Sequence, residues 1–145
     1  MSDASDVEIR AFESRDADGV CGLWRTIFSV DPPWNEPEEV IALKMQVQPE
    51  LFLVATRRGQ IIGTVVAGFD GVRGWIHKLA VAPNVQGAGI ARHLMNEAEL
   101  RLQQMGCTKV NLQIRATNAH VQAFYEKLSY AAEDRISMAK RLTDD

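Results

Sequence analysis

Residues Gln86 to Ala91 read Gln-Gly-Ala-Gly-Ile-Ala and stand between an apolar run and a periodic helical pattern. The first turn of a helix has unpaired backbone N–H groups and a partial positive charge, so it attracts anions, above all phosphate. Small residues at Gly87, Ala88 and Gly89 would let a phosphate approach those groups. The same glycines would also suit a tight strand-to-helix turn, so both interpretations stay open at this point.

Other phosphate-binding loops fit this stretch poorly. It contains no Gly-Lys-Ser or Gly-Lys-Thr, which argues against a nucleoside-triphosphate loop. A dinucleotide-binding fold would place the glycines after the first strand and a carboxylate at the end of the next strand. Here the strand that follows the loop ends in Ile114-Arg115.

Few other side chains suggest catalysis. A histidine titrates in the range that proton transfer needs at neutral pH, and His77 lies in a strand-like run before the loop. Tyr125 is either a phenol that can exchange a proton or an aromatic core residue beside Phe124. Cys21 and Cys107 lack metal-type spacing, so we expect reduced thiols and no metal site.

The composition bounds the class of protein. The chain has 145 residues, of which 46% are hydrophobic and 24% charged, with a formal net charge of -3. We therefore expect a single domain over residues 1–145, with loose tails at 1–5 and 143–145. The acidic balance argues against a nucleic-acid partner, and no apolar run is long enough to cross a membrane. The polar start is no signal peptide, so a cytoplasmic location is expected.

The elements that must position these residues can be predicted from hydrophobic periodicity. Strands are predicted at 7–12, 51–56, 61–69, 75–81, 109–114 and 135–142. Asp16 is expected to cap a first helix, Asn35 and Glu38 have capping-box spacing for a second, and Asn118 opens a short late helix. A third helix is predicted from Gly89 to Met105. The second helix is predicted to run through Val40, Leu43 and Val47. The predicted inner residues of the third helix are Ile90, Leu94, Ala98, Leu102 and Met105.

The connections predict a mixed sheet. Glycine-bearing hairpins join the strands at 51–56, 61–69 and 75–81, so these strands should be antiparallel. The segment from Trp75 through the third helix to Ile114 is a βαβ unit, so its two strands should be parallel. The fold class is therefore α/β, with a mixed sheet flanked by helices.

Three stretches together resemble one family. Residues 86–91 match the Gln/Arg-x-x-Gly-x-Gly/Ala signature of the GCN5-related N-acetyltransferase superfamily, and the chain resembles its small stand-alone bacterial members. The preceding Leu-Ala-Val-Ala-Pro resembles the family's fourth strand, and residues 118–130 resemble its late helix. The resemblance implies the order β-α-α-β-β-β-α-β-α-β with a parallel strand pair that splays apart. Ser129 departs from the pattern, because the family usually has glycine there, at a positive φ.

The resemblance implies acetyl-CoA as the co-substrate and no metal. In the family, amides of the loop hold the pyrophosphate, and the pantetheine arm pairs with the backbone of the fourth strand. An amide near Leu79 would also polarise the thioester carbonyl. Asn118 lies where the family often contacts pantetheine, although a plain helix cap explains it equally well. The residues expected to bind the co-substrate are Leu79, Val81, Gln86, Gly87, Ala88, Gly89, Ile90, Ala91 and Asn118.

The resemblance also suggests two catalytic residues for direct transfer through a ternary complex. Tyr125 matches the tyrosine that protonates the leaving thiolate in many members, and a phenol with a pKa of about 10 suits that exchange. His77 lies two residues before Leu79, so we expect both on one face, with His77 as base and Lys78 on the other face. A packing role is the alternative for each.

The acceptor is the least defined part. The resemblance indicates a small-molecule or peptide amine, bound near the first two helices and the loop after residue 69. Trp34, Asp31, Glu36 and Asp70 would form an aromatic, acidic pocket there, or else a capped loop with solvated acids. Pairing of exposed strands into a homodimer is compatible with the pattern. A non-catalytic acetyl-CoA sensor of the same fold is the alternative function.

Overall fold

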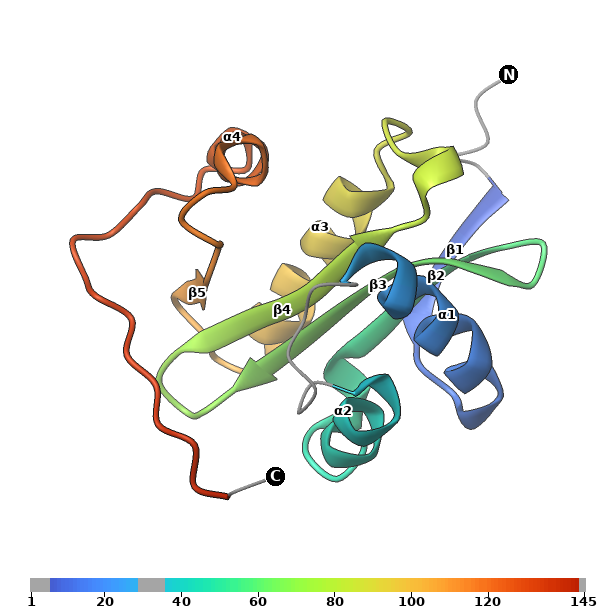
Figure 1. The fold of residues 1–145 in the computed structure, drawn as a ribbon, viewed down its shortest axis with the longest axis horizontal. Coiled ribbons are helices and arrows are strands. Elements are labelled where there is room, and N and C mark those ends of the chain that lie inside the picture. Colours follow the sequence, from blue (N-terminus) through green and yellow to red (C-terminus); the bar gives the residue numbers. More distant parts are fainter. Residues whose placement is uncertain (1–5, 29–35, 144–145) are drawn as a thin grey trace. The chain divides into compact units, whose positions relative to one another are not determined.

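The computed structural model describes residues 6–28 and 36–143. The chain forms two compact units, Met1–Gln113 and Ile114–Asp145, which are described separately below. The first unit contains the sheet, the glycine loop and three helices, and the second contains one helix (Figure 1). The expected single domain over 1–145 stays a prediction.

The first unit is built on a five-stranded mixed sheet in the order β1-β2-β3-β4-β5. Neighbouring strands are antiparallel except β4 and β5, which are parallel, as the hairpins and the βαβ unit predicted. This confirms the mixed α/β fold class. The strands are β1 (Val7–Ala11), β2 (Phe52–Arg57), β3 (Gln60–Phe69), β4 (Gly74–Val81) and β5 (Val110–Leu112).

Two turns fix the register of the central strands. Arg58 and Gly59 both have positive φ, 54° and 79°, which suits the tight hairpin between β2 and β3. Between β3 and β4, the Asp70 carboxylate accepts hydrogen bonds from the backbone N–H groups of Val72 and Arg73, at 2.8 and 2.7 Å.

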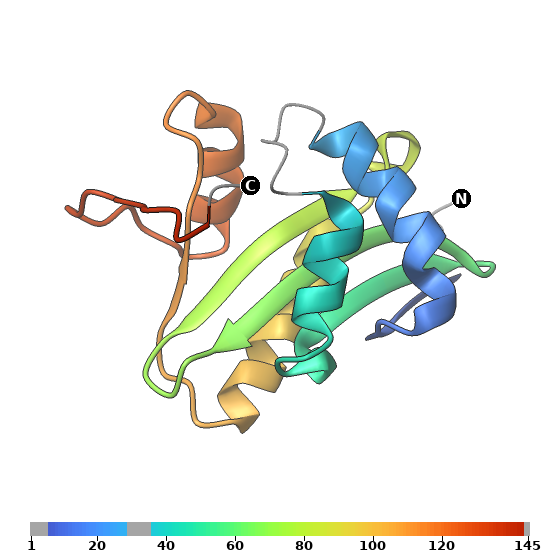
Figure 2. The ribbon, with the colours of Figure 1, turned by 60° about the horizontal axis from the view of Figure 1, so that its bottom comes forward.

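Helices cover both faces of the sheet. Figures 1 and 2 show α1 (Ala17–Ile27) and α2 (Pro37–Lys44) on one face and α3 (Ile90–Gln104) on the other. Within the described residues, no helix is long and apolar enough to span a membrane. The core of the first face includes Val20, Trp24, Ile41, Phe52, Val54, Val66 and Ala80, and that of the second includes Ile90, Leu94, Met95, Ala98 and Leu102.

Two details of the α1–α2 region differ from expectation. The Asp16 side chain does not cap α1, because it accepts hydrogen bonds from Arg10 and from the Glu13 N–H instead. Asn35 lies outside the described residues. Val47 lies beyond the helix, which ends at Lys44, and both Leu43 and Val47 are exposed.

The third helix follows its predicted pattern closely. The expected inner residues are buried except Met105, which is 38% exposed. Gly106 follows with φ of 96°, the left-handed conformation that ends many helices.

The second unit contains α4 (Ala119–Lys127), and Asn118 caps it by accepting a hydrogen bond from the Val121 N–H. Ser129 has φ of 74°, so this turn keeps the positive φ expected of the family's glycine. The predicted strand at 135–142 is wrong for the described chain, which forms no strand there. Apolar alternation can indicate a strand, but a strand also needs a partner, and Ile136 and Met138 are about nine-tenths exposed.

Candidate active site

Strand β4 changes its pairing part-way along. Gly74, Trp75 and Ile76 pair with β3 on one side and, in parallel, with Val110–Leu112 of β5 on the other. The register with β5 ends at Ile76, whereas β4 continues beside β3 to Val81. We call residues 74–76 the doubly paired half and residues 77–81 the singly paired half. The strand pair therefore separates just before the glycine loop.

At the end of the singly paired half, the backbone groups of Val81 are directed away from β3. The Ala82 N–H donates to the Ile62 carbonyl at 2.9 Å, and the direction of the backbone groups alternates along an antiparallel pair. The N–H and C=O groups of Val81, which lies opposite Gly63, therefore point away from β3. This direction fits the predicted pairing with a pantetheine arm, and the contact itself stays a prediction.

A β-bulge interrupts the singly paired half. Thr64 lies opposite Ala80 and Val66 lies opposite His77, so two residues of β4 stand against one of β3. Lys78, within the bulge, has φ of 54°. A residue other than glycine rarely adopts this left-handed backbone conformation, which costs on the order of 1–2 kcal/mol.

Contacts from β3 and α1 hold the bulge in place. The Thr64 hydroxyl donates to the Lys78 carbonyl at 2.8 Å and accepts from the Trp24 indole N–H at 2.8 Å. The Lys78 ammonium lies 5.6 Å from the Trp24 ring centroid and 4.5 Å from that of Phe28. A hydrogen bond contributes about 1 kcal/mol and a cation–π contact about 0.5–1 kcal/mol, so together they offset the backbone strain.

The bulge reverses the side-chain alternation of β4. His77 lies opposite Val66 on the face covered by α1 and α2, and Ala80, three residues later, belongs to the same face. Leu79 must then lie on the α3 face, because side chains alternate between Ala80 and its neighbours. The expectation that His77 and Leu79 share a face is therefore wrong. Lys78, expected on the face opposite His77, shares the α1–α2 face with it.

Desolvation and two lysines lower the pKa of His77. The side chain is exposed, yet the protein atoms around the imidazole displace enough water to lower its pKa. The charges of Lys44 and Lys78 lower this pKa further. His77 is consequently neutral at pH 7 and able to accept a proton. It faces the α1–α2 side, where the resemblance locates the acceptor.

The glycine loop has the geometry of an anion cradle. Gly87 and Gly89 have φ of 91° and 83°, and a Cβ built on either would meet nothing within 4 Å. Gly89 precedes the first turn of α3, where backbone N–H groups lack helical partners. Residues 86–89 are exposed, whereas Ile90 is buried against the sheet. The loop therefore leaves its amides accessible.

Gln86 begins the loop and is among the residues expected to bind the co-substrate. In the structure, its side-chain amide donates to the Val81 carbonyl at 3.1 Å, so it ties the loop to the end of β4.

The remaining candidates lie in the second unit. Asn118 caps α4, which confirms that role, and its contact with pantetheine stays a prediction. Tyr125 is buried, with the rings of Phe124 and Tyr130 at centroid distances of 5.1 and 5.7 Å. Burial raises the pKa of Tyr125 to about 12. Burial thus moves the phenol further from a thiol near 8.5, which is the stronger acid, and the catalytic role of Tyr125 stays a prediction.

The predicted acidic acceptor pocket finds no support among the described residues. Trp34 and Asp31 lie outside them. Glu36 is exposed and lies 3.8 Å from the guanidinium of Arg25, and the Asp70 carboxylate is engaged in the β3–β4 turn. Over the described ranges, no group of three or more histidine, cysteine, aspartate or glutamate side chains is placed to hold a metal ion.

Comparison with known proteins decides the family. The acetyltransferase (GNAT) family model matches residues 20–130, which include the bulge, the loop and α4. An acetyltransferase of Pectobacterium atrosepticum is 42% identical over 139 residues, covering 96% of this chain and 98% of that protein. The chain belongs to the GNAT acetyltransferase family.

Solved structures of the GNAT family share the fold. Ard1 from Thermoplasma volcanium superimposes with a TM-score of 0.77 at 23% identity, covering 87% of this chain and 83% of that one. An aminoglycoside-type enzyme, AAC(6')-Iy, in complex with a CoA bisubstrate analogue, gives a TM-score of 0.77 at 15% identity. It covers 94% of this chain and 99% of that one. At such identities, these likenesses establish the fold alone.

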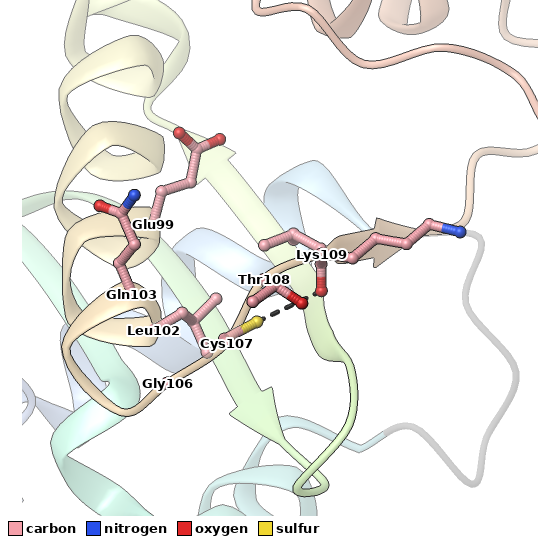
Figure 3. Close-up of a pocket in the computed structure, with 8 residues that line it drawn as sticks. Glu99, Leu102, Gln103, Gly106, Cys107, Thr108 and Lys109 are labelled. Carbon is pink, nitrogen blue, oxygen red and sulfur yellow. Dashed lines mark hydrogen bonds between the residues drawn. The ribbon is translucent and has the colours of Figure 1, made fainter.

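An open hollow lies far from the GNAT loop, where α3 ends. In Figure 3, the Cys107 thiol donates to the Lys109 carbonyl at 3.2 Å within this hollow. The 15 residues of α3 place it about 20 Å from the glycine loop. It lies beside the doubly paired half of β4, since a Cβ on Gly74 would stand 2.9 Å from the Cys107 sulfur. It contains none of the predicted site residues.

Sequence reasoning missed the residues that hold the GNAT bulge. Thr64 is fully buried within a run of apolar residues in β3, and Trp24 reads simply as part of an apolar helix face. A lone hydroxyl in an otherwise apolar strand was the available signal, because a buried hydroxyl requires a hydrogen-bond partner.

Proposed function

We propose that the chain is an N-acetyltransferase that moves the acetyl group of acetyl-CoA to a primary amine within a ternary complex. The observation that carries this proposal is the singly paired half of β4, which leads directly into an exposed glycine loop at the start of α3. An extended ligand arm fits the strand edge, and phosphates fit the loop amides. The known fold of the family supports the same arrangement.

The co-substrate supplies an activated acetyl group, and the chain's residues bind and orient it. We assign the pyrophosphate to the amides of residues 87–91 and the pantetheine arm to the backbone of Leu79 and Val81. The Leu79 amide would donate to the thioester oxygen as negative charge develops on it. Asn118 keeps its side-chain NH₂ available for the arm while its oxygen caps α4.

The transfer requires two proton movements. The amine nitrogen bonds to the acetyl carbon as the carbon–sulfur bond breaks, so the nitrogen loses one proton and the sulfur gains one. We assign the first proton to His77, directly or through water, because its lowered pKa keeps the imidazole neutral. We assign the second to Tyr125, which stays protonated throughout the physiological range.

The raised pKa restricts how Tyr125 would act. Full transfer to a finished thiolate would be uphill by roughly three to four pK units, or about 5 kcal/mol. Hydrogen-bond donation to the sulfur while its bond to carbon breaks does not require that transfer to be complete. The proposed role of Tyr125 is therefore to donate a hydrogen bond that stabilises the charge developing on the sulfur, and its proton passes to the sulfur only as CoA leaves.

A thiol-release assay tests the proposal and separates it from the sensor alternative. Acetyl-CoA is incubated with the protein and a lysine-like amine, an aminoglycoside or a peptide with a free N-terminus. A chromogenic thiol reagent detects free CoA, and a reaction without amine corrects for hydrolysis and for Cys21 and Cys107. We expect amine-dependent release with at least one acceptor class. Acetyl-CoA binding without turnover across a broad amine panel would favour the sensor.

A further inference from the structure

We propose that Thr64 and Trp24 are positioning residues that aim the Leu79 amide by holding the β4 bulge at Lys78. The inference rests on the proposed function, because the amide matters for catalysis only if a thioester lies against it. It extends that function by naming two residues, on β3 and α1, that act through the backbone.

The direction of the Leu79 N–H is fixed by its own peptide plane. A trans peptide is rigid, and its C=O and N–H groups point in opposite directions. The carbonyl of this peptide belongs to Lys78, and it accepts a hydrogen bond from the Thr64 hydroxyl at 2.8 Å. Since that carbonyl points toward the Thr64 hydroxyl, the Leu79 N–H points the opposite way, away from Thr64.

The indole of Trp24 fixes the orientation of the Thr64 hydroxyl. A hydroxyl has one proton to donate and oxygen lone pairs that accept. The Trp24 N–H donates to the Thr64 oxygen at 2.8 Å, and both residues are about fully buried. With its oxygen accepting from Trp24, the hydroxyl directs its proton to the Lys78 carbonyl. The hydrogen-bonded chain therefore runs in one direction, from α1 through β3 to the bulge.

The side chain of Lys78 adds a second anchor on the same helix. Its ammonium lies over the rings of Trp24 and Phe28, at 5.6 and 4.5 Å from their centroids. Trp24 of α1 thus acts on Lys78 in two ways. It reaches the Lys78 carbonyl through the Thr64 hydroxyl, and its ring contacts the Lys78 ammonium. Without these contacts, a residue other than glycine would tend to leave its φ of 54° and rotate the peptide.

The experiment compares Thr64→Val, which keeps the shape and removes the hydroxyl, with Thr64→Ser, which keeps the hydroxyl. Thr56→Val serves as the matched control, because Thr56 is a buried threonine on β2, away from the bulge. For each protein, kcat and KM for acetyl-CoA are measured well below the melting temperature. The carbon chemical shifts of Lys78, recorded by NMR, report its backbone conformation independently of turnover.

We expect Thr64→Val to lower kcat about ten- to a hundredfold, since a misdirected oxyanion donor loses much of its effect. KM for acetyl-CoA should change less than about threefold, and the Lys78 shifts should move away from left-handed values. Thr64→Ser should stay within about threefold of the parent in kcat, and Thr56→Val should leave kcat and the Lys78 shifts unchanged.

Different results would overturn different parts of the account. Unchanged kcat in Thr64→Val, or an equal loss in Thr56→Val, would overturn the positioning role while the proposed function stands. A loss of kcat with unaltered Lys78 shifts would overturn the link through the bulge. A parent protein that turns over no amine would overturn the proposed function, and the catalytic role of Thr64 with it.

Discussion

The two halves of β4 differ in how many neighbouring strands they pair with. Residues 74–76 have hydrogen-bonded neighbours on both sides, and a Cβ on Gly74 would meet the Cys107 sulfur at 2.9 Å. Residues 77–81 pair with β3 alone and contain a bulge. The doubly paired half has sheet partners on both edges, whereas the singly paired half has one open edge, where we propose that the backbone of Leu79 and Val81 binds a ligand. Substitutions in the two halves should therefore affect stability and activity differently.

The largest effect on rate should come from outside β4. If the singly paired half binds the co-substrate, a residue of another segment must donate a hydrogen bond to the leaving sulfur. Tyr125 is the candidate for this role. Tyr125→Phe should retain acetyl-CoA binding and lower kcat roughly 10²- to 10⁴-fold, the usual range for a positioned acid. Phe124→Leu, on the same helix, serves as the control for packing. Equal rates for Tyr125→Phe and the parent would contradict the catalytic role and indicate that Tyr125 is an aromatic core residue.

A substitution in the doubly paired half should act on stability. Gly74→Ala places a Cβ against the Cys107 sulfur at 2.9 Å and a Leu102 methyl at 3.1 Å, so the core must shift. We expect a loss of about 1–3 kcal/mol in the free energy of unfolding, measured by urea denaturation. Gly68→Ala on β3 is the control, since its Cβ would have ordinary contacts at 3.7 and 3.8 Å. Equal stability of the two variants would contradict the tight packing of this half.

The smallest predicted effect concerns the first residue of the singly paired half. The pKa of His77 lies below its ordinary value of 6.5, so a rate that needs neutral His77 should fall only as the pH drops below about 6.5. His77→Ala should lower kcat/KM about tenfold and shift or remove this acidic limb. The check is the pH dependence of kcat/KM with a competent amine. A profile that matches the parent in height and shape would assign His77 to packing.

Much of the fold could be predicted from the sequence because its elements are strongly periodic. The buried residues of α3 follow a helical stripe, and glycine-bearing turns separate β2, β3 and β4. The segment at 135–142 shows the limit of such predictions. Alternation indicates an extended chain, but it does not show whether a neighbouring strand is present to pair with it. Val47 illustrates the same limit, because hydrophobic periodicity does not reveal where the helix ends.

The site could be predicted only in part. The motif at residues 86–91 identifies the loop, because small residues at a helix start have a recognisable pattern. The direction of His77 could not be predicted, since one extra residue in a bulge exchanges the faces of everything that follows. The pKa of Tyr125 depends on how deeply the ring is buried, and the pairing of Gln86 with Val81 depends on the path of the loop. These properties arise from tertiary packing.

The central claim is that the loop after β4 binds acetyl-CoA through its backbone amides. Calorimetric titration of acetyl-CoA into the parent, Gly89→Glu and Gly59→Glu tests it most directly. Both glycines have positive φ, 83° and 79°, and open space at the Cβ, so the two variants carry similar backbone strain. Only Gly89→Glu places bulk and negative charge at the proposed phosphate site.

We expect binding by the parent and by Gly59→Glu, and no measurable binding by folded Gly89→Glu. Unchanged affinity in folded Gly89→Glu would contradict the assignment of the loop as the phosphate cradle.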